Sequence, residues 1–278
     1  MHVGEARSIA RRWLSEHVAP LPRFRGALWH GSMLTLPDDA PLDPLSDVDL
    51  IAVFDAPPAD LRPGKQPIEG VMLDVTVLPW RDVRDPESVL ANHQLAPSFR
   101  SPELLADPSG DLAALRDVVA HNFSRREWVE RRVERAVNKA HAFLSGIDPG
   151  APFAGNVMSW LFGTGVTTHV LLVAGMRNPT VRKRYVAVRE LLRDNGIPQV
   201  HDDLLRLLGS ARLSRGQASR HLDALEPTFD PAAAAIRTPV PFPASDLSPA
   251  ARPISIDGSR TMIAAGDHQE AMFWIAVT

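Results

Sequence analysis

The order of apolar and polar positions divides the chain into two regions with different periods. In the first region, short apolar runs alternate with segments rich in Pro, Asp and Gly, which favour turns. The runs predict strands at 24–30, 48–54 and 71–78, after an amphipathic helix near the N-terminus. A short strand, a turn at 107–110 and a helix are predicted for SPELLADPSGDLAALRDVVAHNF. We therefore expect an α/β (α+β) fold with a mixed sheet in this region.

The second region has apolar positions at helical spacing from residue 124 onward. Its first helix opens with SRRE, in which Ser124 and Glu127 have the spacing of a capping box. The change of period places the domain boundary here. It gives an α/β domain of residues 1–123 and a helical-bundle domain of residues 124–278.

Further helices are predicted in the second region from capping signals. One is bracketed by Asn178, with Pro179 in its first turn, and by Gly196 past its end. Shorter helical pieces are expected at 204–208 and 214–225, and GDHQEAMFWIAVT is expected to form a last apolar helix. The Pro-rich segment 226–253 is predicted to be a linker without regular structure.

One uncharged segment, VMSWLFGTGVTTHVLLVAGM at 157–176, has the length of a membrane span. Gly163 and Gly165 interrupt it, and its Ser, Thr and His side chains would need partners in lipid, so we expect it to be buried in protein. His169 in this segment lacks the spacing of a zinc ligand. We interpret it as a hydrogen-bonded core or cleft histidine.

The composition narrows the classes of protein that fit. A content of 45% hydrophobic and 23% charged residues is that of a soluble globular protein with a sizeable core. The absence of Cys excludes disulfides, thiolate zinc sites and cysteine nucleophiles. With no signal-peptide pattern, we expect a cytoplasmic protein without a membrane partner. The net charge of −3 gives no overall attraction to nucleic acid.

Candidate chemistry is concentrated between the first and third predicted strands. Gly31 and Ser32 follow the first strand, and Asp47 and Asp49 stand at the start of the second. Side chains two residues apart on a strand share one face, so these two carboxylates would repel each other without a cation. Gly31 would let a phosphate approach the backbone, and Ser32 could donate from its hydroxyl and its amide.

A third carboxylate, Asp74, stands inside the apolar run VMLDVTV. An ionised Asp among apolar neighbours is costly unless it is paired or bound to metal. Together with Asp47 and Asp49 it would form an all-oxygen site suited to Mg²⁺ and completed by substrate phosphates. The alternative is that Asp47, Asp49 and the Gly-Ser pair belong to ordinary turns and strand edges, but this alternative leaves Asp74 unexplained.

The pattern HGS…DVDL…LDV resembles the signature of the nucleotidyltransferase superfamily of the polymerase-β type. The helical second half resembles that of the aminoglycoside nucleotidyltransferases in style, while the motif resemblance covers residues 24–119. Two features depart from the pattern. The loop from Ser32 to Asp47 is longer than usual, and His30 precedes the glycine where an apolar residue is commoner.

The resemblance implies transfer of a nucleoside monophosphate, usually AMP from ATP, although another nucleoside triphosphate would serve. The acceptor would be a hydroxyl of a small molecule, such as an aminoglycoside-like antibiotic. Asp47 and Asp49 would hold two Mg²⁺ ions at the triphosphate, and Asp74 would hold the ion nearer the acceptor and could take its proton. Related enzymes use a Glu of the helical domain as base, but no position of this sequence matches it unambiguously.

Charged residues are segregated on the helix that follows Ser124. Basic residues lie on one side of its apolar stripe and acidic residues on the other; they are Arg131, Arg132, Arg135 and Lys139, and Glu127, Glu130 and Glu134. One interpretation is a solvated helix with ion pairs between residues four apart. The other places Arg132 and Lys139 on the triphosphate and Glu130 or Glu134 near an amine-bearing acceptor. The basic run at 182–185 could do the same or only coat a surface.

Two rival functions remain open from the sequence. RNA or protein could be the acceptor, as in toxin-type members of the superfamily, with support from the Arg-rich helices. Nucleic acid is nevertheless the less favoured partner. A catalytically inactive, nucleotide-binding regulatory protein is disfavoured because Asp47, Asp49 and Asp74 are all present.

Overall fold

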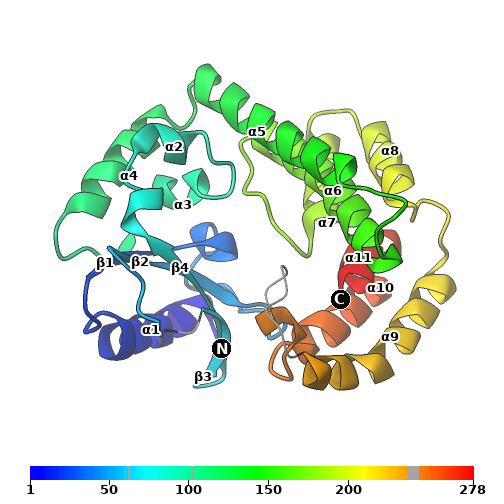
Figure 1. The fold of residues 1–278 in the computed structure, drawn as a ribbon, viewed down its shortest axis with the longest axis horizontal. Helices are drawn as coiled ribbons and strands as arrows, with labels where there is room; N and C mark the ends of the chain where they lie inside the picture. Colours follow the sequence, from blue (N-terminus) through cyan, green and yellow to red (C-terminus); the bar gives the residue numbers. More distant parts are fainter. Residues whose placement is uncertain (60, 62, 102, 237–243) are drawn as a thin grey trace. The chain divides into compact units, whose positions relative to one another are not determined.

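The computed structural model describes residues 1–59, 61, 63–101, 103–236 and 244–278 (Figure 1). The chain folds into two compact units. The first contains Met1–Trp128, and the second contains nearly all described residues from Val129 to Thr278. The predicted boundary at residue 124 lies between helix α4, Asp111–Asn122, and helix α5, Arg126–Ser145.

The first unit is built on a five-stranded mixed sheet with the order β3-β4-β2-β1-β5. Its strands are β1 (Phe24–Trp29), β2 (Val48–Phe54), β3 (Gly64–Ile68), β4 (Val71–Pro79) and β5 (Leu104–Ala106). Strands β2 and β4 are parallel and the other pairs are antiparallel. The predicted strands β1, β2, β4 and β5 are confirmed. Strand β3 was not predicted, because it is a short edge strand with few apolar residues and an internal Pro67.

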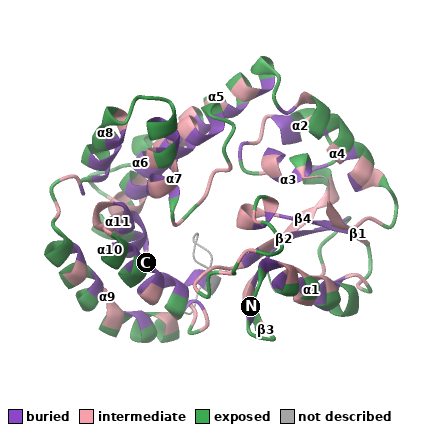
Figure 2. Ribbon diagram, turned by 180° about the vertical axis from the view of Figure 1, so that it is seen from behind, coloured by how far each residue is buried: buried purple, intermediate pink, exposed green. Residues whose placement is uncertain are grey.

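Helices cover both faces of this sheet (Figure 1). On one side, α1 (Val3–Trp13) packs against alternate residues of the central strands, such as Leu50 and Leu73. On the other side, α2 (Pro86–Leu90), α3 (Ala96–Arg100) and α4 enclose Ile51 and Val53. Because β2 is buried on both faces, it has a continuous apolar run instead of an alternating pattern (Figure 2).

The second unit is helical. Its helices are α5, α6 (Phe153–Ala174), α7 (Arg184–Asp194), α8 (Gln199–Leu208), α9 (Arg215–Ala235), α10 (Gly258–Ala265) and α11 (His268–Val277). Gly163 and Gly165 lie inside α6 and do not break it. A Cβ atom at these positions would lie 2.7 Å from Leu144 and 2.5 Å from Phe273 respectively, so the glycines permit close packing.

The apolar helix α6 is the one helix in the described part of the chain with the length and hydropathy of a membrane span. Half of its most apolar stretch is buried inside the protein, as in the core helix of a globular unit. His169 on this helix is buried, and its Nε2 lies 2.8 Å from the Thr180 carbonyl oxygen. Its interpretation as a hydrogen-bonded core histidine is therefore confirmed.

Two predictions for the second unit were wrong in their boundaries. Helix α9 continues through Pro227 and Pro231 into the predicted linker 226–253, because Leu222 and Phe229 are buried in a shared core with α10 and α11. Of these two residues, Phe229 lies beyond the first proline, and its burial favours continuing the helix past that proline. The linker also contains short helical turns at Ala244–Leu247 and Pro253–Asp257, while residues 237–243 lie outside the described residues.

Helix α7 was predicted from Pro179 but begins at Arg184. The segment before it runs irregularly past Thr180, whose carbonyl group is the partner of His169. The C-terminal end agrees with the prediction, since Gly196 follows the helix with a φ of 72°.

Candidate metal centre

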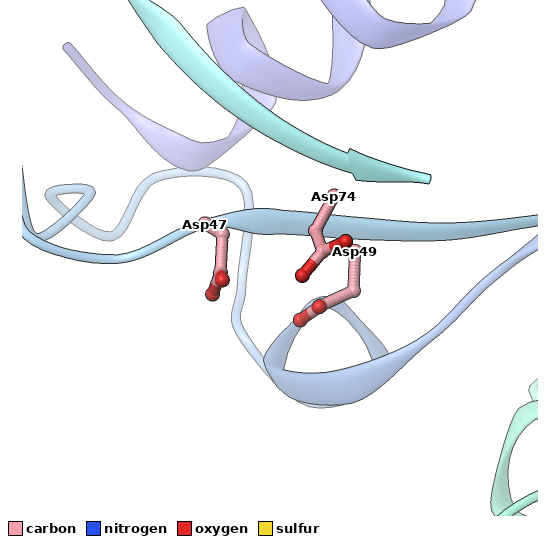
Figure 3. Close-up of side chains that lie close together, drawn as sticks. All are labelled: Asp47, Asp49 and Asp74. Atoms are coloured by element: carbon pink, nitrogen blue, oxygen red, sulfur yellow. The ribbon is translucent and has the colours of Figure 1, made fainter. Parts of the chain in front are cut away.

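The register of the sheet places the predicted acidic residues in line. Asp49 on β2 pairs with Asp74 on the parallel strand β4, and Asp47 directly precedes β2. Figure 3 shows the three side chains pointing to the same side of the strand. One carboxylate oxygen of each lies within 4.8 Å of the others. We call Asp47, Asp49 and Asp74 the acidic row.

The face that Asp74 occupies follows from strand alternation. Its neighbours Leu73 and Val75 belong to the core on the α1 side of the sheet, so Asp74 projects to the other side with Asp49. Strand alternation thus places the Asp74 carboxylate opposite both apolar neighbours.

A turn at Gly31–Leu34 supports Asp49. Gly31 has a φ of 56°, and a Cβ atom there would lie 2.0 Å from Asp49 Oδ2, so only glycine fits. The backbone amide of Ser32 donates to the Asp49 carboxylate, and the His30 amide donates to the Asp49 carbonyl oxygen at 3.0 Å. The sequence assigned Gly31 to phosphate approach; the structure shows that its missing side chain makes room for Asp49.

The Ser32 hydroxyl belongs to the same turn. Its oxygen is buried and has no hydrogen-bond partner among the described residues. A buried hydroxyl without a partner is costly, and a bound ligand oxygen would relieve that cost. Ser32 therefore fits its predicted role as a donor to a ligand.

The electrostatics of the row are dominated by Asp49. Burial raises the pKa of its carboxyl group well above the usual range, and the charges of Asp47 and Asp74 raise it further. Lys65 and the Ser32 amide only partly offset this rise. The row thus has an excess of negative charge, and a cation would relieve it.

Lys65 on β3 is a member of the site that the sequence did not reveal. It pairs with Asp74 in the β3-β4 register, and its Nζ lies 2.8 Å from Asp47 Oδ2 and 2.5 Å from Asp74 Oδ2. The sequence contains one signal for this position, the pair Glu69-Gly70. In the structure both residues have positive φ and form a two-residue hairpin turn. Recognising that turn would have placed Lys65 opposite Asp74.

The two features that depart from the motif, His30 and the long loop after Ser32, are both held by hydrogen bonds within the first unit. His30 Nδ1 lies 2.6 Å from Ser98 Oγ on α3, and burial lowers the His30 pKa. The long loop after Ser32 is held by Arg7 of α1. The Arg7 guanidinium donates to the carbonyl oxygens of Met33 at 2.5 Å and Leu36 at 3.1 Å.

The predicted phosphate-binding residues Arg132 and Lys139 lie on α5 in the second unit. Arg132 is only 2% exposed, and Glu127, Glu130 and Glu134 are exposed on the same helix. Burial lowers the pKa of Lys139, and the nearby charges of Arg184 and Arg135 lower it further. We call Arg135, Lys139 and Arg184 the basic group.

Arg184 is the most enclosed member of the basic group. Its guanidinium lies over the Phe273 ring at 4.1 Å, and its Nε donates to the Val181 carbonyl oxygen at 2.7 Å. Its Nη1 is buried without a hydrogen-bond partner among the described residues, and burial lowers its pKa to about 10. The idea that the basic run at 182–185 only coats a surface is therefore wrong, since Tyr185 is buried as well.

Neither protein-family models nor curated proteins gave a match to this sequence. The resemblance to nucleotidyltransferases of the polymerase-β type therefore depends on the motif residues and their geometry.

Proposed function

We propose that the chain is a divalent-metal-dependent nucleotidyltransferase. It transfers a nucleoside monophosphate, with AMP from ATP as the favoured case, to a hydroxyl group of a small molecule such as an aminoglycoside-like antibiotic. The observation that carries the proposal is the convergence of Asp47, Asp49 and Asp74 on one face, next to the turn that contains Gly31 and Ser32.

The residues present fit a divalent metal. Three carboxylates provide the hard oxygen ligands that Mg²⁺ prefers, and they leave positions for water and phosphate oxygens. Asp47 and Asp49 would hold the ion at the triphosphate, and Asp74 would contribute to a second ion near the acceptor. Bound Mg²⁺ would neutralise charge on the triphosphate and lower the pKa of the acceptor hydroxyl.

The protein's own groups would orient the reaction. The Ser32 hydroxyl can donate to a phosphate oxygen, and the Asp74 carboxylate can accept the proton of the attacking hydroxyl. The acceptor oxygen forms a bond to the α-phosphorus while the bond to the bridging oxygen breaks. Pyrophosphate is the product that leaves.

The basic group of the second unit supports an anionic substrate. Arg184 has a buried donor atom without an acceptor among the described residues. Its charge also lowers the pKa of Lys139. We propose that these residues, with Arg132, bind phosphate oxygens of the nucleotide. Arginine and lysine donors form strong, charge-assisted hydrogen bonds to such oxygens.

Pyrophosphate release tests the proposal most directly. The full chain would be assayed with each nucleoside triphosphate, with Mg²⁺ or with chelator, against aminoglycosides, other hydroxylated small molecules, RNA and protein. We expect release that needs both metal and a small acceptor, and its loss in Asp47→Asn and Asp49→Asn. Asp82→Asn removes an exposed carboxylate of the same unit and should behave like the parent.

Three results would contradict the proposal. The first is release that is independent of metal, and the second is activity retained in Asp49→Asn. The third, transfer to RNA or protein with none to small molecules, would keep the chemistry and overturn the acceptor class.

A further inference from the structure

Lys65 contacts two of the three carboxylates that a metal ion would use. Its Nζ contacts Asp47 Oδ2 at 2.8 Å and Asp74 Oδ2 at 2.5 Å, and its side chain is only 7% exposed. Because the β3-β4 register fixes Lys65 opposite Asp74, the contact is built into the hairpin. It is not the chance meeting of two long surface side chains.

The ammonium and a divalent ion have conflicting requirements. A Mg²⁺ ion binds carboxylate oxygens at about 2.0–2.1 Å and tolerates little distortion. The hydrogen bonds from Lys65 take up lone pairs on one carboxylate oxygen of Asp47 and one of Asp74, which are two of the three proposed metal ligands. A positive charge left beside the ion would also repel it, most strongly where water is excluded.

Lys65 nevertheless serves the protein when metal is absent. Three carboxylates with oxygen atoms within 4.8 Å of one another repel. The Lys65 ammonium lies next to two of them and reduces this repulsion. One ammonium faces three carboxylates, so the cluster keeps an excess of negative charge. The lysine therefore stabilises the empty site without satisfying it.

We infer that Lys65 is a tethered competitor of divalent cations: its ammonium holds the acidic row together in the metal-free protein and is displaced when an ion binds. The inference rests on the proposed metal centre. Competition from Lys65 would make the affinity of the site for metal lower than the affinity of the three carboxylates without the lysine. The displaced ammonium would then be available to an anion, such as a nucleotide phosphate.

Calorimetric titration of Mn²⁺ into the full chain, without nucleotide, tests the inference. Lys65→Met should bind Mn²⁺ with an affinity about tenfold or more higher than the parent, equivalent to about 1.4 kcal/mol or more. Lys65→Gln, which keeps a polar donor but no charge, should change the affinity in the same direction. Arg81→Met removes an exposed positive charge from the same unit and should bind like the parent.

Thermal melting of the same preparations gives a second reading. The Lys65 variants should melt at a lower temperature than the parent in chelator, and Mn²⁺ should raise their melting temperature by more. If a variant is unfolded in chelator, recovery of its helical circular dichroism on addition of Mn²⁺ supports the inference. Absence of recovery in both variants overturns it.

The outcomes separate this inference from the proposed function. Unchanged or weaker Mn²⁺ binding in folded Lys65 variants, with normal binding by the parent, overturns the inference and leaves the metal centre intact. Binding by the variants and none by the parent supports it. If no protein binds Mn²⁺, the proposed metal centre is wrong and the inference fails with it.

Discussion

Enclosed charges of opposite sign distinguish the two units of the chain. In the first unit, the acidic row sets three carboxylates against the one ammonium of Lys65, so negative charge is in excess. In the second unit, the basic group sets Lys139 beside two arginines, and Arg184 keeps a buried donor atom without an acceptor among the described residues. Each unit, taken by itself, is suited to an ion of the opposite sign.

A third set of charges, in the second unit, is an example of a guanidinium paired with carboxylates. Arg189 of the second unit donates to Asp267 at 2.8 Å and also to the buried Glu270. Its guanidinium thus has carboxylate partners within its own chain. Burial of charge alone is therefore a poor sign of a binding site, whereas an excess of one sign is informative.

The largest effect is expected from Asp74→Asn, which tests whether the acidic row has divided roles. If Asp74 serves the acceptor side, turnover should fall by about a hundredfold or more, while nucleotide affinity changes far less. Single-turnover rates and melting temperatures would be measured on one preparation. A normal rate in the folded fraction, with a lowered melting temperature, would show that Asp74 has a structural role only.

A smaller but specific effect is expected from Gly31→Ala. The new methyl group would lie 2.0 Å from Asp49 Oδ2, so the ligand must move and Mn²⁺ affinity should fall by about tenfold or more. Gly110→Ala is the matched control, because Gly110 also has positive φ (79°) but open space where its Cβ would stand. Equal Mn²⁺ affinity in the two variants would show that the close contact with Asp49 has no role in metal binding.

The basic group can be tested without any metal through Arg184→Met. We expect affinity for tripolyphosphate in chelator to fall by about tenfold, because a charge-assisted donor is lost. The melting temperature should stay level or rise, since a buried and incompletely paired charge is replaced by an apolar side chain. Arg193→Met, in the exposed last turn of α7, is the control. A lowered melting temperature with unchanged tripolyphosphate affinity would make Arg184 a structural residue.

The acidic row could be predicted from sequence because strand geometry is local. The spacing of Asp47 and Asp49 places both side chains on one face of their strand. The apolar neighbours of Asp74 indicate the face on which the Asp74 side chain lies. Lys65 could not be placed in this way, because its position depends on a polar edge strand and on the register of a hairpin. The part of the site that follows from alternation was predicted directly, whereas the part that follows from strand pairing required the Glu69-Gly70 turn to be recognised first.

Helical burial was harder to predict than helical period. The stripe on α5 indicated which side carries Arg132 and Lys139, but nothing in the period of α7 showed that Arg184 would lie buried over Phe273. Pro227 and Pro231 likewise indicated a linker from local propensity alone. The burial of Phe229 outweighed that propensity, as tertiary contacts often do.

Strand β3 also affects how molecules of this chain behave toward one another. It is the outermost strand in the sheet order, so no described strand pairs with its outer side. Open edges of this kind invite pairing between molecules, which leads to aggregation. Pro67 lacks a backbone donor, and the strand is only five residues long, and both features discourage such pairing. The edge that brings Lys65 to the acidic row is thereby protected against self-association.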